Sequence, residues 1–208
     1  MKITALTKKG NNVLVCFEDG EFVAIDYRTV LDHGLRRNDD IDENKKEQLI
    51  SESEFVKAKD SSFRSLSKRP HSTLELKNKL LKKGYTKKTV ERTVQNMKNG
   101  NYLNDDQFTK LFIEERVKRK KTGVNKLKAE LFKRGIDRKI IEENLSDIDS
   151  ETNFENAVSL AKRKSELLIR RGIEPKKVKQ KVFSFLSSRG YESEVIMKIL
   201  RHLELDEE

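Results

Sequence analysis

The chain has 208 residues, 38% charged and 35% apolar, which excludes one thick hydrophobic core and favours thin helical layers; disorder is the competing interpretation. The net charge of +10 is uneven, because residues 1–54 hold 8 Lys/Arg against 12 Asp/Glu and carry a net −4. A single cysteine, no apolar run near the ~20 residues of a membrane span, and no apolar leader exclude a disulfide framework and a membrane or secreted protein, and indicate a cytoplasmic one.

Residues 1–34 are predicted to form a small β module ending in a short helix. Apolar runs at 3–6, 13–17 and 22–25 are separated by the turn signals KKGNN (8–12) and EDGE (18–21), whose Asp-Gly suits a tight hairpin. The helix, at about 27–33, ends at Gly34. Cys16 is expected to be a small buried apolar residue. Because three strands bury little alone, the module should pack on a neighbour.

Residues 35–54 are interpreted as a linker, LRRNDDID, followed by the start of a connecting helix. The helical pattern begins at about Asp42, where acidic residues complement the helix dipole. Its apolar positions are Leu49, Ile50, Phe55 and Ala58.

The rest of the chain is governed by an internal repeat anchored on Gly84, Gly135 and Gly190. Apolar residues recur eight and four positions before each glycine, which places them on one face of a helix that ends at the glycine. Others recur one, six, ten and thirteen positions after it, and the last three form a stripe on the next helix. The three sets are Leu76, Leu80, Tyr85, Val90, Val94 and Met97; Leu127, Leu131, Ile136, Ile141, Leu145 and Ile148; and Val182, Leu186, Tyr191, Ile196, Leu200 and Leu203.

A third helix precedes each pair. Its stripe begins with Phe108, Leu111 and Phe112 in the second copy, and a capping box at Ser72 and breaks at 123 and 175 separate the first two helices of the units. We therefore predict a mainly α fold of three tandem three-helix repeats, at 55–104, 105–150 and 151–208, in an elongated curved array that follows the β module.

Motifs for catalysis and cofactor binding are missing. The three histidines are far apart and have no cysteine or second histidine at metal-ligand spacing, and neither a phosphate loop nor G-x-G-x-x-G occurs. We expect no enzymatic activity, no cofactor and no metal.

Basic residues, in contrast, are clustered in every repeat and can neutralise phosphates. The run at 116–121 favours a contact surface, whereas scattered lysines fit a solvated helix face. Tyr85 and Tyr191 are expected in the core, whereas for Tyr102 stacking on a nucleic-acid base is an open alternative. The candidate contact residues are Lys68, Arg69, Arg116, Lys118, Arg119, Lys120, Lys121, Lys126, Lys162, Arg163, Lys164, Arg170, Arg171, Lys176 and Lys177.

Several of these motifs resemble those of the RecX family. LSKRPHS (66–72), followed by LLKKGY (80–85), is similar to the first-repeat signature, and YLNDDQF (102–108) resembles the junction into the second repeat. GV at 123–124 with KRGI (133–136) is similar to the second-repeat signature. The resemblance covers 55–148 well and the third repeat more loosely, and the β module resembles an extension found in part of the family.

The resemblance implies a regulator in recombination, repair and the SOS response, and we expect a monomer. It implies binding to RecA and to its filament on single-stranded DNA, in the filament groove, with reduced ATP hydrolysis and strand exchange. Double-stranded DNA is a further expected partner and a membrane is not. The family has no catalytic residue to carry over. A DNA- or RNA-binding helical protein without a RecA partner is the alternative, and an enzyme is a third.

Overall fold

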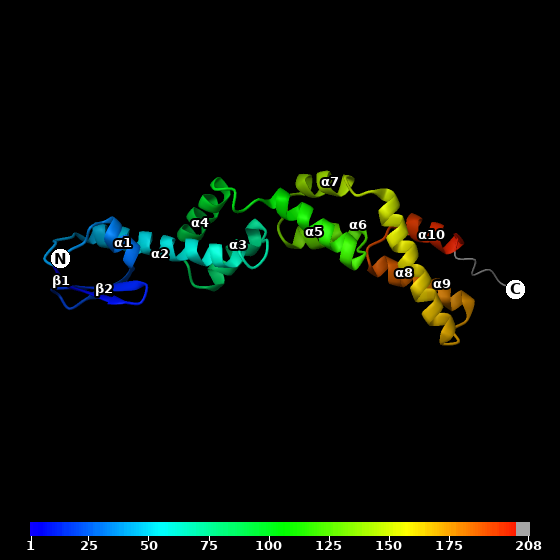
Figure 1. Ribbon diagram of the computed structural model, residues 1–208, viewed down its shortest axis with the longest axis horizontal. Helices are drawn as coiled ribbons and strands as arrows, with labels where there is room; N and C mark the ends of the chain where they lie inside the picture. Colours follow the sequence, from blue (N-terminus) through cyan, green and yellow to red (C-terminus); the bar gives the residue numbers. More distant parts are fainter. Residues whose placement is uncertain (203–208) are drawn as a thin grey trace. The chain divides into compact units, whose positions relative to one another are not determined.

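The computed structural model describes residues 1–202, which form three strands and ten helices (Figure 1). They group into two compact units, Met1–Leu103 and a second that begins at Asn104. The strands are β1 (Ile3–Lys9), β2 (Asn12–Phe17) and β3 (Phe22–Asp26), and the helices are α1 (Tyr27–Asp32), α2 (Glu43–Leu66), α3 (Thr73–Lys82), α4 (Lys87–Asn99), α5 (Asp105–Lys120), α6 (Val124–Lys133), α7 (Arg138–Ser146), α8 (Ser150–Arg170), α9 (Pro175–Ser188) and α10 (Ser193–His202).

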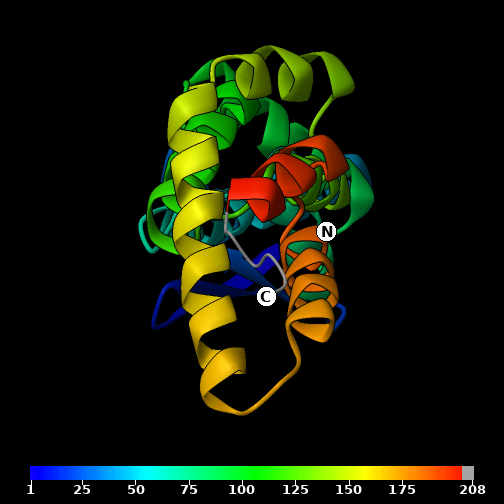
Figure 2. The same ribbon diagram turned by 90° about the vertical axis from the view of Figure 1, so that its right-hand side faces the viewer.

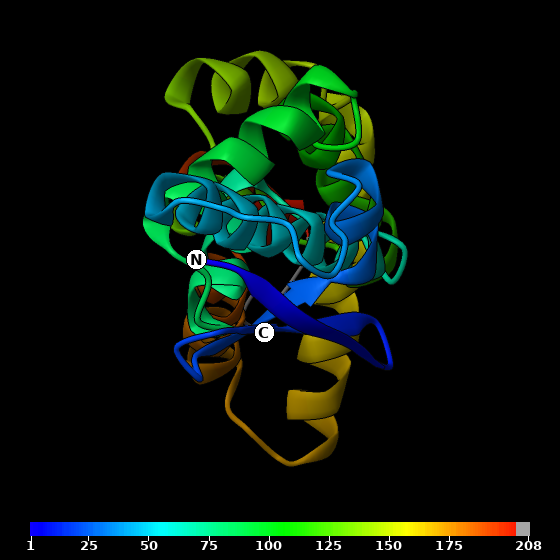
Figure 3. The same cartoon turned by 90° about the vertical axis from the view of Figure 1, so that its left-hand side faces the viewer.

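The three strands form an antiparallel sheet with β2 at its centre, which confirms the predicted module. Alternation along β2 sends Val13, Val15 and Phe17 into the core of the module. Cys16, which lies between two of these positions, therefore faces the opposite side of the sheet and is only half-buried, so the expectation that it is a buried residue was wrong. Figure 3 shows the sheet beside α1 and α2.

Helix α2 serves both the sheet and the first repeat. It begins after Asp42, whose carboxylate accepts a hydrogen bond from the backbone amide of Lys45 at 2.7 Å. Near its middle, the Ser53 hydroxyl accepts from the Asp26 amide of β3 at 2.7 Å, and further along the Lys57 carbonyl accepts from the Tyr85 hydroxyl at 3.1 Å. Helix α2 runs without a break through residues 54 and 55, where the sequence predicts a boundary. Its first part is therefore the neighbour on which the small sheet packs, and its later part belongs to the first repeat.

The first repeat consists of the later part of α2 with α3 and α4. The capping box is present, because the Ser72 hydroxyl accepts from the Glu75 amide at 3.1 Å and the Glu75 carboxylate accepts from the Ser72 amide at 3.4 Å. Gly84 has a φ of 88° and turns the chain into α4. The predicted positions Leu76, Leu80, Val90 and Met97 are fully buried in one core.

The second unit holds the other two repeats, α5–α7 and α8–α10, each around its own hydrophobic core. Gly135 and Gly190 have φ values of 72° and 89°, and Pro175 is the first residue of α9, as predicted. Figure 2 shows α10 packed across α8 and α9. Leu203, the last position of the predicted repeat, lies outside the described residues.

Two apolar positions differ from the sequence prediction. Leu111 is 46% exposed because the buried stripe of α5 follows Phe108, Phe112 and Ile113 instead. Ile50 is 43% exposed, one residue beyond the buried Leu49 and hence turned by about 100° around the helix.

Candidate nucleic-acid interface

Within the second unit, the break between α5 and α6 packs on the turn between α9 and α10. Lys121 is the C-cap of α5 and has a φ of 47°, and Gly123 is the N-cap of α6. The Gly123 amide donates to the Arg189 carbonyl at 2.9 Å, and the Asn125 amide donates to the Gly190 carbonyl at 3.0 Å. The second and third repeats are thus held together by main-chain hydrogen bonds.

The same end of α5 also lies against the middle of α8. The Lys121 ammonium donates to the Ser159 hydroxyl at 2.7 Å, and the Asn156 amide donates to the Val117 carbonyl at 3.4 Å. Lys162 and Arg163 follow Ser159 by one helical turn, on the same face of α8, and both are exposed. Two basic runs that are about 40 residues apart in the sequence therefore lie next to one another.

Two further basic residues complete this group. The Lys126 ammonium donates to the Ser188 carbonyl at 3.3 Å, and the Arg189 guanidinium donates to the Lys120 carbonyl at 3.3 Å. We call the group the basic junction, and it comprises Lys120, Lys121, Lys126, Lys162, Arg163 and Arg189, together with Arg119, which is exposed and immediately precedes Lys120 in the chain.

The basic junction differs from an ordinary lysine-rich helix face in its lack of acidic partners. Within residues 1–202, none of its seven side chains forms an ion pair with a carboxylate; the contacts they make are with carbonyl and hydroxyl oxygens and, for Arg189, the Phe185 ring. Glu155 and Glu166 lie on the same face of α8 without pairing to Lys162 or Arg163. Unpaired cations gathered in one place create a positive potential that attracts phosphate groups.

Arg189 was not among the candidates from the sequence. A signal was present, because a basic residue immediately precedes each repeat glycine, as Lys83, Arg134 and Arg189. The sequence pattern does not distinguish these three positions. Arg189 reaches the junction because the turn between α9 and α10, in the third repeat, packs on the second repeat.

The run at 116–121 does not form one continuous surface. Arg116 is 18% exposed, pairs with Glu130 at 3.1 Å, and has its guanidinium carbon 4.9 Å from the centre of the Phe112 ring. Lys118 pairs with Glu114 at 2.6 Å. Arg116 lies four residues after Phe112 and so follows the buried stripe of α5. Its position is explained by packing within the second repeat.

The other candidates are not part of the basic junction. Arg170, Arg171 and Lys176 are exposed at the turn between α8 and α9, and Arg170 is about 10 Å along α8 from Arg163. Lys68 is exposed in the first unit. The remaining candidates have intramolecular partners: Arg69 pairs with Glu75, Lys177 pairs with Glu174, and Lys164 lies over the Phe185 ring.

Of the two tyrosines expected in the core, Tyr191 is buried and Tyr85 packs against the core of the first repeat. Tyr191 is 4% exposed, its hydroxyl donates to the Lys121 carbonyl at 2.8 Å, and burial raises the pKa of its phenol to about 12. Tyr85 is half-buried. Tyr102 is 59% exposed and packs edge-on against Phe63, with ring centres 4.9 Å apart. Of the three tyrosines considered, Tyr102 thus offers the most open ring for stacking.

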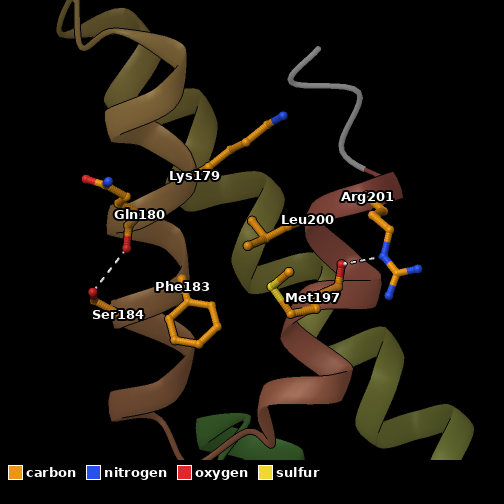
Figure 4. Close-up of a pocket in the computed structure, with 7 residues that line it drawn as sticks. All are labelled: Lys179, Gln180, Phe183, Ser184, Met197, Leu200 and Arg201. Atoms are coloured by element: carbon orange, nitrogen blue, oxygen red, sulfur yellow. Dashed lines mark hydrogen bonds between the residues drawn. The ribbon is translucent and has the colours of Figure 1, made fainter.

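A separate groove of about 730 Å³ lies between α9 and α10 (Figure 4). Phe183, Met197 and Leu200 give it an apolar surface, with Lys179 and Arg201 on its rim. None of the candidate residues lines it. In the described part of the chain no group of three His, Cys, Asp or Glu side chains is placed to hold a metal ion, and none of the described helices is both long and apolar enough to span a membrane.

The fold defines a class: a tandem helical-repeat protein whose three three-helix units follow a small β module. Family models for the first, second and third three-helix domains of RecX match residues 58–96, 104–145 and 151–200. The chain therefore belongs to the RecX family.

Relatives and solved structures agree with this assignment. The Regulatory protein RecX of Clostridium perfringens (strain 13 / Type A) is 31% identical over 97% of this chain and 96% of its own length. The Regulatory protein RecX of Clostridioides difficile (strain 630) is 29% identical over 97% of this chain and 94% of its own length. A crystal structure of a regulatory protein RecX, 17% identical, has a TM-score of 0.75 over 97% of this chain and 98% of its own. A crystal structure of RecX from Lactobacillus salivarius, 19% identical, has a TM-score of 0.65 over 74% of this chain and 98% of its own. The two structures support the fold.

Proposed function

We propose that the chain binds the RecA recombinase and its filament on single-stranded DNA, and that it mainly inhibits the filament's ATPase and strand-exchange activity. The observation that carries the proposal is the unbroken series of three RecX three-helix domains across residues 58–200. A 31% identical relative named Regulatory protein RecX supports a regulatory role.

The basic junction supports a contact with nucleic acid within that role. Seven cations without an acidic partner among residues 1–202 can neutralise phosphates of single- or double-stranded DNA without reading the base sequence. Repeated weak contacts along a filament would then add up by avidity, so no deep pocket is needed. We further propose that the chain acts as a cytoplasmic monomer without cofactor or catalysis, in recombination, repair and the SOS response.

The test is the ATPase rate of RecA on single-stranded DNA, measured with increasing amounts of the chain. We expect the rate to fall as the chain is added. Lys162→Ala/Arg163→Ala should weaken the inhibition, while Arg138→Ala/Lys139→Ala removes the same charge from exposed positions of α7 that are paired with Glu142 and Glu143, and should leave it unchanged. An unaltered RecA rate at saturating wild-type protein would refute the proposed function.

The lack of acidic partners for the basic junction within the described residues 1–202 also supports the alternative of a general nucleic-acid-binding protein. Binding to single-stranded DNA titrated with salt, with and without RecA, separates the two. Loss of two phosphate contacts in Lys162→Ala/Arg163→Ala should reduce the slope of log K against log salt by about 1.4. Tight binding that RecA does not change, together with no effect on its ATPase, would favour the alternative.

A further inference from the structure

The sheet of the β module has an apolar outer face that no helix of the first unit, residues 1–103, covers. Strand pairing aligns Ala5, Cys16 and Phe22 in one row across the sheet, and Thr7, Leu14 and Ala24 in the next. These six residues, which we call the outer face, project away from the core formed by Val13, Val15 and Phe17. Phe22 is 66% exposed, and Leu14 and Cys16 are half-buried.

This arrangement is unusual for an antiparallel sheet with one packed face, whose other face is ordinarily polar. Only Thr7 of the six outer-face residues carries a hydroxyl group, and none is charged. A contiguous apolar surface with an exposed aromatic ring is typical of sites that contact another macromolecule.

Charge indicates the kind of macromolecule. The β module, residues 1–34, holds five Asp/Glu against four Lys/Arg, a net −1, and two of its acids, Glu18 and Asp19, are exposed in the hairpin next to Phe22. Lys8 and Lys9 lie at the opposite end of the sheet. The acidic hairpin beside the exposed ring repels phosphate groups of nucleic acid and lipid at that end of the sheet, and it suits a protein surface on which an apolar patch is bordered by lysine or arginine.

We infer that the outer face is a protein-docking surface, and that its partner is a protein with an apolar patch bordered by basic side chains. The identity of that partner rests on the proposed function, which makes it a subunit of the RecA filament. The chain then divides its contacts: the β module binds protein through its outer face, and the basic repeats bind DNA phosphate.

The first arm of the test uses Phe22→Ser, with Leu31→Ser as the matched control. Leu31 is a 70% exposed apolar residue of the same module, on α1 and outside the outer face, so neither change should disturb folding. We expect Phe22→Ser to raise the concentration that half-inhibits RecA by about tenfold, the effect of losing an aromatic anchor, and to change single-stranded DNA affinity without RecA less than twofold. Leu31→Ser should match the wild type in both assays.

The second arm uses Cys16, the chain's single cysteine, as a reporter at the centre of the outer face. Its alkylation by iodoacetamide is followed by mass spectrometry. RecA filaments should slow the reaction, and single-stranded DNA alone should not.

The outcomes separate the two proposals. Equal inhibition by the wild type and Phe22→Ser, or an unprotected Cys16 while the wild type inhibits, would overturn the docking surface and leave the proposed function standing. Protection that rises with the chain's own concentration in the absence of RecA would also overturn it, because the face would then join copies of this chain. A wild type that neither binds nor inhibits RecA would remove the proposed function and the partner with it.

Discussion

A Cβ atom added to Gly123 would lie 2.4 Å from the carbonyl carbon of Gly190, so the two glycines pack backbone to backbone. One precedes α6 and the other follows α9, and this contact joins the second and third repeats. A Cβ on Gly190 would in turn lie 2.4 Å from the backbone nitrogen and the Cβ of Lys126.

Gly190→Ala should therefore destabilise the second unit by more than backbone strain alone. The φ of 89° costs alanine about 1 kcal/mol, and displacement of the facing backbone should add about 1–3 kcal/mol. Gly123→Ala, at an ordinary φ of −74°, should show only the second effect. Chemical denaturation measures both.

Gly172→Ala is the control in the same unit. Gly172 has a φ of 70° but nothing within 4 Å of an added Cβ, so only the strain should appear. An equal decrease in the free energy of unfolding for Gly172→Ala and Gly190→Ala would show that the contact between the repeats adds nothing to stability.

Arg116→Ala should lower stability rather than only weaken DNA binding. The side chain pairs with Glu130 and lies over the Phe112 ring, so its removal loses both packing and a cation–π contact, about 1–2 kcal/mol. Arg119→Ala, at an exposed position of the basic junction, should change the free energy of unfolding by less than ~0.5 kcal/mol and should lower DNA affinity. Both variants are measured by denaturation and by salt-titrated DNA binding. A stable Arg116→Ala variant with weakened DNA binding, together with a destabilised Arg119→Ala variant that binds DNA normally, would refute these two roles.

Arg28→Ala should loosen the β module from α2. The guanidinium donates to both carboxylate oxygens of Asp26, at 2.9 and 3.1 Å, and to those of Asp60 on α2, at 3.0 and 2.5 Å. Asp26 is 2% exposed, so the variant leaves a buried carboxylate without its cation and should cost about 2 kcal/mol after allowance for the partly exposed arginine. Asp60→Asn removes the more exposed partner and should cost less than ~1 kcal/mol. Similar values for the two variants in denaturation would contradict this account.

His71 should titrate below the ordinary histidine value of about 6.5. Burial lowers the pKa of its imidazole, and the nearby Arg69 and Lys79 charges act in the same direction. Its Nδ1 lies 2.8 Å from the Arg69 carbonyl and therefore carries the proton in the neutral ring. An NMR titration of the imidazole signals measures the shift.

The same shift sets a pH dependence of stability. The unfolded chain takes up the proton at higher pH than the folded chain, so the free energy of unfolding should be unaffected above about pH 7 and should fall as the pH drops through 6.5 towards the lowered pKa. His71→Gln should flatten this fall in denaturation between pH 7.5 and 5.5. An unchanged slope would contradict a neutral buried His71.

The sequence by itself determined the helices, turns and repeat cores, because their signals are local. The spacing of Leu76 and Leu80, the glycine that follows and the cap at Ser72 all act within a few helical turns. Within residues 1–202 the same period placed the cores of the three repeats correctly, apart from details such as Leu111.

Only the tertiary structure decided which basic side chains are available and which surfaces are covered. Arg116 is engaged by Glu130, 14 residues away, while Arg189 reaches Lys120 across 69 residues. Alternation along β2 puts Cys16 opposite the core, but the packing of α1 and α2 on the inner side alone leaves the outer face open. Charge pairing and burial depend on neighbours that are distant in the sequence, and a helical period carries no information about them.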